Sequence, residues 1–298
     1  MAGAAGWTAK AGAFGPFSKS ARKTRNLHGL RKVLASAGSL DVRIATTRKE
    51  IRRAQKLRYR VFFEEGGAIA DPTARLIRRD VCRFDAVCDH LIVVDHAAPT
   101  GDGSPSVVGA YRLLRQSVAE VNFGFYSDAE FDVASLLARH PSKRFLELGR
   151  SCVAEGYRGK RTLELLWRGI WAYALHHRID VMFGCASFPG ADPAAHAPAL
   201  DFLTGDGATQ PQWRVAAAPH RAARLGAPPT PLDPRAAARA LPPLIKGYWR
   251  LGARFSPDAV ADTAFGTTDV FVVLPIEEIQ DRYLAHFAPP PDTSALAA

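Results

Sequence analysis

The sequence predicts an α/β protein with a mixed, twisted sheet and flanking helices. Residues 145–153 form a mostly apolar strand, and residues 181–187 form a second one. Between them, apolar side chains recur at three- and four-residue spacing, which is typical of an amphipathic helix; they are Leu163, Leu166, Trp167, Ile170, Trp171, Ala174 and Leu175. A strand, a helix and a strand in this order indicate a crossover unit.

The sequence predicts further strands and helices on both sides of this crossover unit. We expect a strand over 41–45 and a helix over 49–63. The branched apolar runs 91–95 and 107–114 are strands, because a turn containing Gly and Pro separates them. Residues 189–240 are rich in Pro and Ala and predict an insertion with short helices. A helix over 244–250 and a closing strand over 269–274 complete the expected sheet.

Length and composition predict one domain with a large core. The chain has 298 residues, of which 47% are hydrophobic, so it can bury a core without disulfides or a structural metal. Its four cysteines form no C-x-x-C pair and have no zinc spacing, so we expect free thiols, a reducing compartment and no metal site. We expect a domain over 41–287 with the insertion inside it, and a disordered tail over 288–298.

The N-terminal segment carries most of the net charge. Residues 1–40 contain seven Lys or Arg and no acid, against a total net charge of +10. A flexible basic tail is one interpretation. Leu27, Leu30 and Leu34 could also line a short helix that contacts an anionic membrane, and an acid-free start resembles an organelle transit peptide. A nucleic-acid arm is disfavoured, since the rest of the chain shows no basic and aromatic recognition face. No apolar run is long enough to span a bilayer, so we expect a cytoplasmic protein, with peripheral contact to the cytoplasmic membrane face as an open alternative.

A cationic turn opens the helix that follows residue 159. Arg158, Lys160 and Arg161 stand where a helix dipole disfavours cations and where backbone N–H groups lack partners. A bound anion would reverse this effect, and Gly159 would let its oxygens approach the backbone. We therefore expect a phosphate site over Arg158, Gly159, Lys160, Arg161 and Thr162; a solvated basic loop is the alternative.

Glu147 is an isolated acid in the strand 145–153, and Arg150 follows it. A carboxylate with a pKa raised by burial can remove the proton of an ammonium group, which must be neutral to act as a nucleophile. A purely structural Glu147–Arg150 pair is the alternative. No Ser or Cys here has the partners that covalent catalysis requires.

Six segments are similar to one enzyme family. They are Leu57-Arg-Tyr-Arg-Val-Phe62, Asp89-His-Leu91, Val108-Gly-Ala-Tyr-Arg-Leu-Leu114, Glu147-Leu-Gly-Arg-Ser151, Tyr157-Arg-Gly-Lys-Arg-Thr162 and Phe265-Gly-Thr-Thr-Asp-Val270. Together they resemble the L-ornithine Nα-acyltransferases, a branch of the GNAT superfamily, from about residue 41 to 286. Arg161 and Leu163 stand where the superfamily's phosphate loop has small residues.

The resemblance implies a GNAT-like fold and transfer of a fatty 3-hydroxyacyl group to the α-amino group of ornithine, giving lyso-ornithine lipid. It implies acyl carrier protein as partner, with the donor on phosphopantetheine and no permanently bound cofactor. Glu147 and Arg150 would be catalytic. The substrate would contact Arg58, Phe62, Asp85, Asp89 and Arg112, where Asp85 and Asp89 receive an amino group of the acceptor.

Three alternatives stay open. The acceptor could be another amino acid, the donor could be acyl-CoA, or the chain could be a silent membrane-binding protein that kept the fold. Acyl-homoserine-lactone synthases also resemble this chain at Arg58, Phe62, Arg112, Glu147 and Arg150. Their acidic pair lies three residues apart, whereas Asp85 and Asp89 lie four apart.

Overall fold

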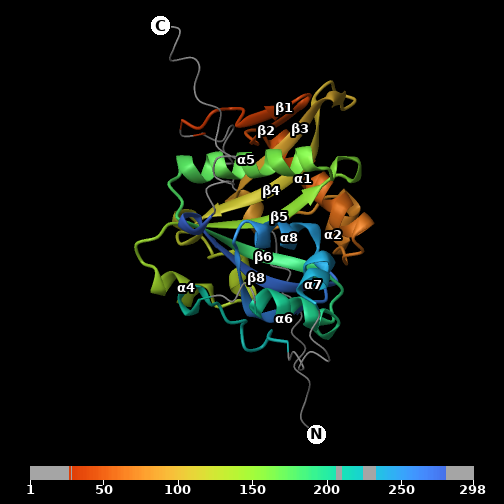
Figure 1. Ribbon diagram of the computed structural model, residues 1–298. Helices are drawn as coiled ribbons and strands as arrows, with labels where there is room; N and C mark the ends of the chain where they lie inside the picture. Colours follow the sequence, from red (N-terminus) through yellow and green to blue (C-terminus); the bar gives the residue numbers. More distant parts are fainter. Residues whose placement is uncertain (1–26, 28, 206–209, 224–232, 280–298) are drawn as a thin grey trace.

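A computed structural model describes residues 27, 29–205, 210–223 and 233–279. In this part of the chain, eight strands form one sheet in the order β1-β2-β3-β4-β5-β6-β8-β7 (Figure 1). The strands are β1 (Ala35–Ala37), β2 (Leu40–Ile44), β3 (Asp89–Pro99), β4 (Pro105–Arg115), β5 (Phe145–Val153), β6 (Val181–Pro189), β7 (Arg254–Asp262) and β8 (Thr267–Pro275). Only β5 and β6 pair in parallel; all other neighbours are antiparallel. The predicted mixed α/β sheet is confirmed.

Two helices cover opposite faces of the central strands. Helix α1 (Arg48–Tyr59) packs on β4, β5 and β3, and helix α5 (Lys160–His176) packs on β2, β3 and β4. In Figure 1, α5 crosses in front of the sheet while α1 lies behind it. Gly169 lets α5 approach closely, because a Cβ there would lie 2.6 Å from Val42. Of the predicted apolar stripe of α5, Leu166, Ile170, Trp171 and Ala174 are buried, whereas Leu163 and Leu175 are exposed.

The ends of α1 show how local sequence sets its boundaries. Thr47 caps the helix by accepting from the Glu50 N–H, and the Glu50 carboxylate accepts from the Thr47 N–H in return. At the other end, α1 passes into a π-helical turn, Arg60–Glu65, instead of continuing as an α-helix to residue 63. Gly67, in the left-handed region at φ 76°, follows this turn.

Short helices complete the described chain. They are α2 (Pro72–Ile77), α3 (Gln116–Ala119), α4 (Val133–Arg139), α6 (Ala197–Gly205), α7 (Pro234–Ala240) and α8 (Pro243–Arg250). Helices α6 and α7 lie in the segment predicted as a Pro/Ala-rich insertion, and α6 packs on β7. Strand β7 was not predicted: Pro257 lies inside it, at an edge of the sheet beside a register shift, where a strand tolerates proline.

The short membrane-binding helix, one of the interpretations of residues 27–34, is not formed by the residues of this segment that the structure describes. These form turns and irregular backbone, and Leu27, Leu30 and Leu34 pack against the main core. Strand β1 then lies within the segment 1–40 that we expected to be flexible. Residues 1–26 and the predicted tail 288–298 lie outside the described residues. Among the helices described, none has both the length and the apolar character needed to cross a bilayer.

Candidate active site

Strands β5 and β6 separate after three residue pairs. Glu147 is opposite Phe183 in the last of them, and β6 then continues along β8 as far as Pro189. Gly184 lies where the strands diverge, and a Cβ there would come within 2.3 Å of the Leu148 carbonyl oxygen. The resulting gap is about 10 Å³ in volume and is lined by Leu148, Met182, Phe183, Gly184, Cys185, Tyr248, Val272 and Leu274. A ligand larger than one water must displace side chains to enter it.

A bulge in β5 sets the position of Arg150. The register between β4 and β5 shifts between Ala110 and Arg112, and Arg150 has a left-handed backbone with φ 51°. Such a conformation costs a non-glycine residue about 1–2 kcal/mol, so the surrounding contacts must hold it. The Arg150 guanidinium carbon lies 4.7 Å from the ring centroid of Tyr126 and 4.4 Å from that of Phe265. Two aromatic faces therefore hold this cation.

Arg58 is a buried support of Arg150. Its side chain is 1% exposed, and its Nε lies 2.7 Å from Asp80 Oδ2. Asp80 Oδ2 also lies 3.3 Å from Arg150 Nε, so the carboxylate bridges the two guanidinium groups. The second partner of Arg58 is Asp85, at 2.9 Å. This geometry makes Arg58 a positioning residue; its predicted contact with substrate stays a prediction.

The predicted acidic pair does not come together. Asp85 lies on the α1 side, where Arg58, His90 and Arg112 hold its pKa well below the ordinary value in spite of its burial. Asp89 instead accepts from the Tyr173 hydroxyl of α5, at 2.7 Å. Helices α1 and α5 lie on opposite faces of the sheet, so the two carboxylates cannot bind one amino group. Asp85 lies in a 3-10 turn, Arg83–Ala86, that precedes β3, whereas Asp89 is the first residue of β3.

Arg112 is also buried, at 3% exposure. Its Nη1 donates to Cys82 Sγ at 2.7 Å and lies 3.7 Å from Asp85. The Arg112 guanidinium carbon is 5.3 Å from the Tyr126 ring centroid. Arg112 and Arg150 thus approach the same tyrosine from two strands. Phe62, the remaining predicted contact from this part of the chain, meets Phe265 edge to face at 6.0 Å and is half-buried beside Arg150.

Glu147 holds the 3-10 turn Tyr126–Ala129 onto the sheet. Its Oε1 accepts from the Ser127 N–H at 2.7 Å and from the Ser127 hydroxyl at 2.6 Å, and its Oε2 accepts from the Tyr126 N–H at 2.9 Å. Burial raises the pKa of Glu147 although these donors oppose the rise. The Ser127 Oγ lies 3.4 Å from Cys185 Sγ, at the gap. Ser127 therefore connects Glu147 to Cys185, which lines the gap, by hydrogen bonds.

Three carboxylates that the sequence did not single out as site residues gather beside Cys185. They are Glu130, Asp262 and Asp269, and one carboxylate oxygen of each lies within 4.8 Å of one oxygen of the other two. Arg221 Nη2 lies 3.0 Å from Glu130 Oε1, and Cys185 Sγ lies 3.7 Å from Glu130 Oε2. Burial and the two aspartates raise the pKa of Glu130 to about 7. We call these residues the acidic cluster.

Only one member of the acidic cluster could have been found from the sequence. Asp269 closes the Phe265–Val270 segment that carries part of the family resemblance. Glu130 and Asp262 belong to no local pattern, and they meet only because the sheet places β7 and β8 beside the turn that Glu147 anchors. A set of carboxylates like this one can bind an ammonium group or a divalent cation.

The predicted phosphate loop is placed at the N-terminus of α5. Gly159 is the N-cap and has no side chain to cap the helix, and a Cβ on it would meet open space. Lys160 is 87% exposed, while Arg158 forms an ion pair with Glu65. Arg161 extends toward Gly38, in the turn between β1 and β2. Thr162 is buried, so only its backbone could meet a phosphate.

Comparison with known proteins defines the class of enzyme. Residues 57–168 match the family model of an acetyltransferase (GNAT) domain, a range that begins at the end of α1 and contains β3, β4, the bulged strand β5 and the first half of α5. This match indicates a GNAT-type acyltransferase domain over these residues. A solved structure of FeeM, an N-acyl amino acid synthase from uncultured soil microbes, aligns with 84% of this chain and 98% of its own, at 12% identity and a TM-score of 0.48.

Curated relatives define the family more narrowly. The chain is 50% identical over 273 residues to the L-ornithine N(alpha)-acyltransferase of Agrobacterium fabrum (strain C58 / ATCC 33970), covering 91% of each protein. It is 52% identical over 256 residues to that of Rhizobium meliloti (strain 1021), covering 86% of each. The chain belongs to the L-ornithine Nα-acyltransferase family.

Proposed function

We propose that the protein transfers a fatty 3-hydroxyacyl group from the phosphopantetheine of acyl carrier protein to the α-amino group of L-ornithine, giving lyso-ornithine lipid. The names of the relatives support ornithine as the acceptor. The GNAT domain match supports acyl transfer from a thioester.

One observation carries the choice of acceptor: Arg150 and the acidic cluster, which have opposite charge, lie near one another. Ornithine has one carboxylate and two amino groups. Arg150, between Tyr126 and Phe265, suits the carboxylate, because guanidinium pairs with a carboxylate through two parallel hydrogen bonds. The acidic cluster suits an ammonium group, and Arg150 is near enough to Asp269 to oppose the rise in its pKa. A neutral or acidic amino acid would bring no second cation to these carboxylates, of which Glu130 pairs with Arg221.

The chemistry requires a base near neutral pH. The α-ammonium loses a proton, its nitrogen attacks the thioester carbonyl carbon, the C–S bond breaks, and the thiolate leaves and takes up a proton. Two carboxylates fit the role of base: Glu147, linked to Cys185 at the gap through Ser127, and Glu130, whose pKa of about 7 is close to the operating pH. Their pH profiles, treated in the Discussion, distinguish them.

The donor assignment is supported by the N-terminus of α5. Its first N–H groups have no side-chain cap, and Arg158 and Lys160 lie beside it, in ion pairs with Glu65 and Glu164. A phosphate would be held by the helix dipole and by these cations together.

We also propose contact with an anionic membrane through residues 1–26, which contain five of the seven cations of the N-terminal segment. Each cation near such a surface contributes about 1 kcal/mol. Co-sedimentation of the full-length protein and a 1–26 deletion with anionic vesicles at low salt tests this, and equal binding would contradict it.

The main experiment supplies the purified enzyme with 3-hydroxyacyl carrier protein or the matching acyl-CoA, and with ornithine, lysine or glutamine. Mass spectrometry then identifies the products. We expect amide formed at the α-nitrogen of ornithine, with the carrier thioester as the better donor. Equal rates with glutamine would contradict the acceptor assignment, and a preference for acyl-CoA would contradict the donor assignment.

A further inference from the structure

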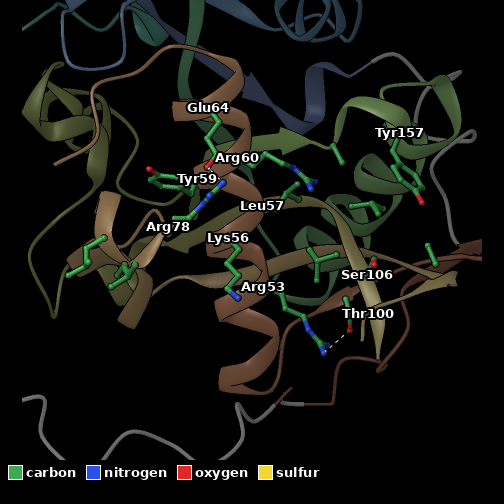
Figure 2. Close-up of a pocket in the computed structure, with 16 residues that line it drawn as sticks. Arg53, Lys56, Leu57, Tyr59, Arg60, Glu64, Arg78, Thr100, Ser106 and Tyr157 are labelled. Carbon is green, nitrogen blue, oxygen red and sulfur yellow. Dashed lines mark hydrogen bonds and ion pairs between the residues drawn. The ribbon is translucent and has the colours of Figure 1, made fainter. Parts of the chain in front are cut away.

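A cavity of about 580 Å³ lies beside α1, outside the gap between β5 and β6. Its walls come from α1, the π-helical turn, α2, the hairpin between β3 and β4, and the end of β5. We call it the α1 cavity; its lining is Arg53, Lys56, Leu57, Tyr59, Arg60, Glu64, Leu76, Ile77, Arg78, Ala98, Thr100, Ser106, Val107, Val108, Ala154 and Tyr157. Figure 2 shows Arg53, Lys56 and Arg60 following one another along α1, with Arg78 on one side and Tyr157 on the other.

The lining of the α1 cavity is cationic and only partly neutralised. It contains four cations and one acid. Arg78 pairs with Glu64 at 2.5 Å, and Arg53 pairs with Asp102 at 2.7 Å. Arg60 lies 3.6 Å from Glu65, a loose contact, and the exposed Lys56 has no ion pair within the described chain. The cavity therefore offers positive charge to a partner.

An apolar side chain stands at the edge of this charge. Leu76 of α2 lines the α1 cavity and is 85% exposed, the highest exposure among the large apolar residues described. Ile69, in the loop before α2, is 71% exposed. An exposed apolar group beside cations is a common composition of a protein interface, where apolar contacts fill the centre and charges surround them.

The α1 cavity adjoins the phosphate loop. Tyr157 lines the cavity and belongs to the 3-10 turn Glu155–Tyr157 before α5. Arg158 forms its ion pair with Glu65, at the end of the π-helical turn. From Leu148 at the gap to Ala154 at the cavity the chain advances six residues, roughly 20 Å at about 3.3 Å per residue. A donor must therefore reach the gap on an extended arm while its carrier stays at this end of the sheet.

We infer that the α1 cavity docks an acidic helix of the protein that carries the acyl donor, with Leu76 as its apolar contact. This inference rests on the proposed use of a carrier protein as donor. The shape favours a protein over a bilayer, because a helix can enter a concave site.

The test compares matched variants on two donors. Lys56→Glu reverses one charge of the α1 cavity, and the new carboxylate has Arg52 and Arg60 four residues away on each side of α1, so the helix keeps its stability. Arg214→Glu makes the same change at an exposed site that is not part of the cavity. Leu76→Gln and Val121→Gln form the apolar pair, since Val121 is 79% exposed elsewhere. The donors are acyl carrier protein and acyl phosphopantetheine, which lacks the protein.

We expect Lys56→Glu and Leu76→Gln to raise the KM for acyl carrier protein roughly tenfold at low salt, and the Lys56→Glu effect to shrink as salt rises. Both should leave kcat and the KM for acyl phosphopantetheine unchanged, and both controls should behave like the wild type. Unchanged KM values for the carrier would overturn the inference while the proposed function stands. So would loss of anionic-vesicle binding by Lys56→Glu with normal carrier kinetics. A wild type that uses acyl-CoA and not the carrier would refute the donor assignment, and the docking inference with it.

Discussion

The protonation of Glu130 makes a measurable prediction about stability. Its side chain is buried at 5% exposure, and burial together with Asp269 and Asp262 raises its pKa from the ordinary 4.5 to about 7, although Arg221 acts in the other direction. The folded protein therefore prefers the protonated acid. Replacement of Glu130 by Gln supplies a neutral side chain of the same shape, which can still accept from Arg221 through its amide oxygen.

The direction of the pH dependence of stability follows from the linkage between protonation and folding. A group whose pKa is higher in the folded state contributes its stability below the unfolded value, near pH 4.5, and loses that contribution as the pH rises through about 7. One pKa unit corresponds to about 1.4 kcal/mol, so the loss is about 3 kcal/mol. Between pH 5 and pH 8, the free energy of unfolding of the wild type should fall by about this amount relative to Glu130→Gln.

Urea unfolding at four pH values measures this difference in the absence of substrate. Glu120→Gln, at an exposed carboxylate after α3, is the control and should run parallel to the wild type. If the wild type and Glu130→Gln keep a constant difference from pH 5 to pH 8, the carboxyl is not perturbed and the electrostatic reasoning fails.

The same variant separates the two candidate bases. If Glu130 accepts the proton of the acceptor, the rise of kcat/KM around pH 7 is lost in Glu130→Gln and kept in Glu147→Gln. If Glu130 only binds an ammonium group, Glu130→Gln raises the KM for ornithine and keeps the shape of the profile. An unchanged KM and an unchanged profile would remove Glu130 from the acceptor site.

Three further predictions follow from the geometry. Glu147→Gln should fold but lose most acyl transfer at neutral pH, with a smaller loss at high pH. Its free energy of unfolding should fall by about 1–3 kcal/mol, because a buried N–H loses its acceptor. Turnover equal to the wild type would remove Glu147 from the mechanism. Gly184→Ala should lower both stability, by about 1–3 kcal/mol, and turnover, because its Cβ meets the Leu148 carbonyl oxygen; a thermal melt and an activity equal to the wild type would show that the strands adapt. Deletion of residues 1–36 should lower the melting temperature, since it removes leucines packed on the core, whereas a melt equal to the wild type would show that those contacts contribute nothing.

The structure also explains why some residues with a resemblance to family motifs do not face a substrate. Arg58 and Asp85 are compensated inside the protein by Asp80 and by each other. Their strict pairing fixes Asp80, which in turn holds Arg150 in its left-handed backbone. A motif indicates that a residue type is needed at a position; it does not say whether the side chain contacts the ligand or orients one that does.

The local sequence pattern determined those helices and strands whose apolar residues recur at regular spacing or whose ends carry a helix-capping signal. The strand 145–153, the helix after Gly159 and the strand from Val181 lie where the apolar spacing predicted them, because periodicity and caps act over a few residues. The uncapped N-terminus of α5 was likewise visible as a run of cations after Gly159. The sequence pattern did not predict strand β7, because this edge strand contains Pro257 and a proline normally argues against a strand.

Tertiary structure decided the site itself. Glu130 meets Asp262 and Asp269 from more than a hundred residues away, and Tyr126 meets Phe265 around Arg150 in the same way. The separation of β5 from β6 and the opposite faces of Asp85 and Asp89 also depend on how whole strands pair and on which helix covers each face. Contacts between distant segments form only once the sheet order is set, and the sheet order depends on the burial of the whole chain, not on any short stretch of it.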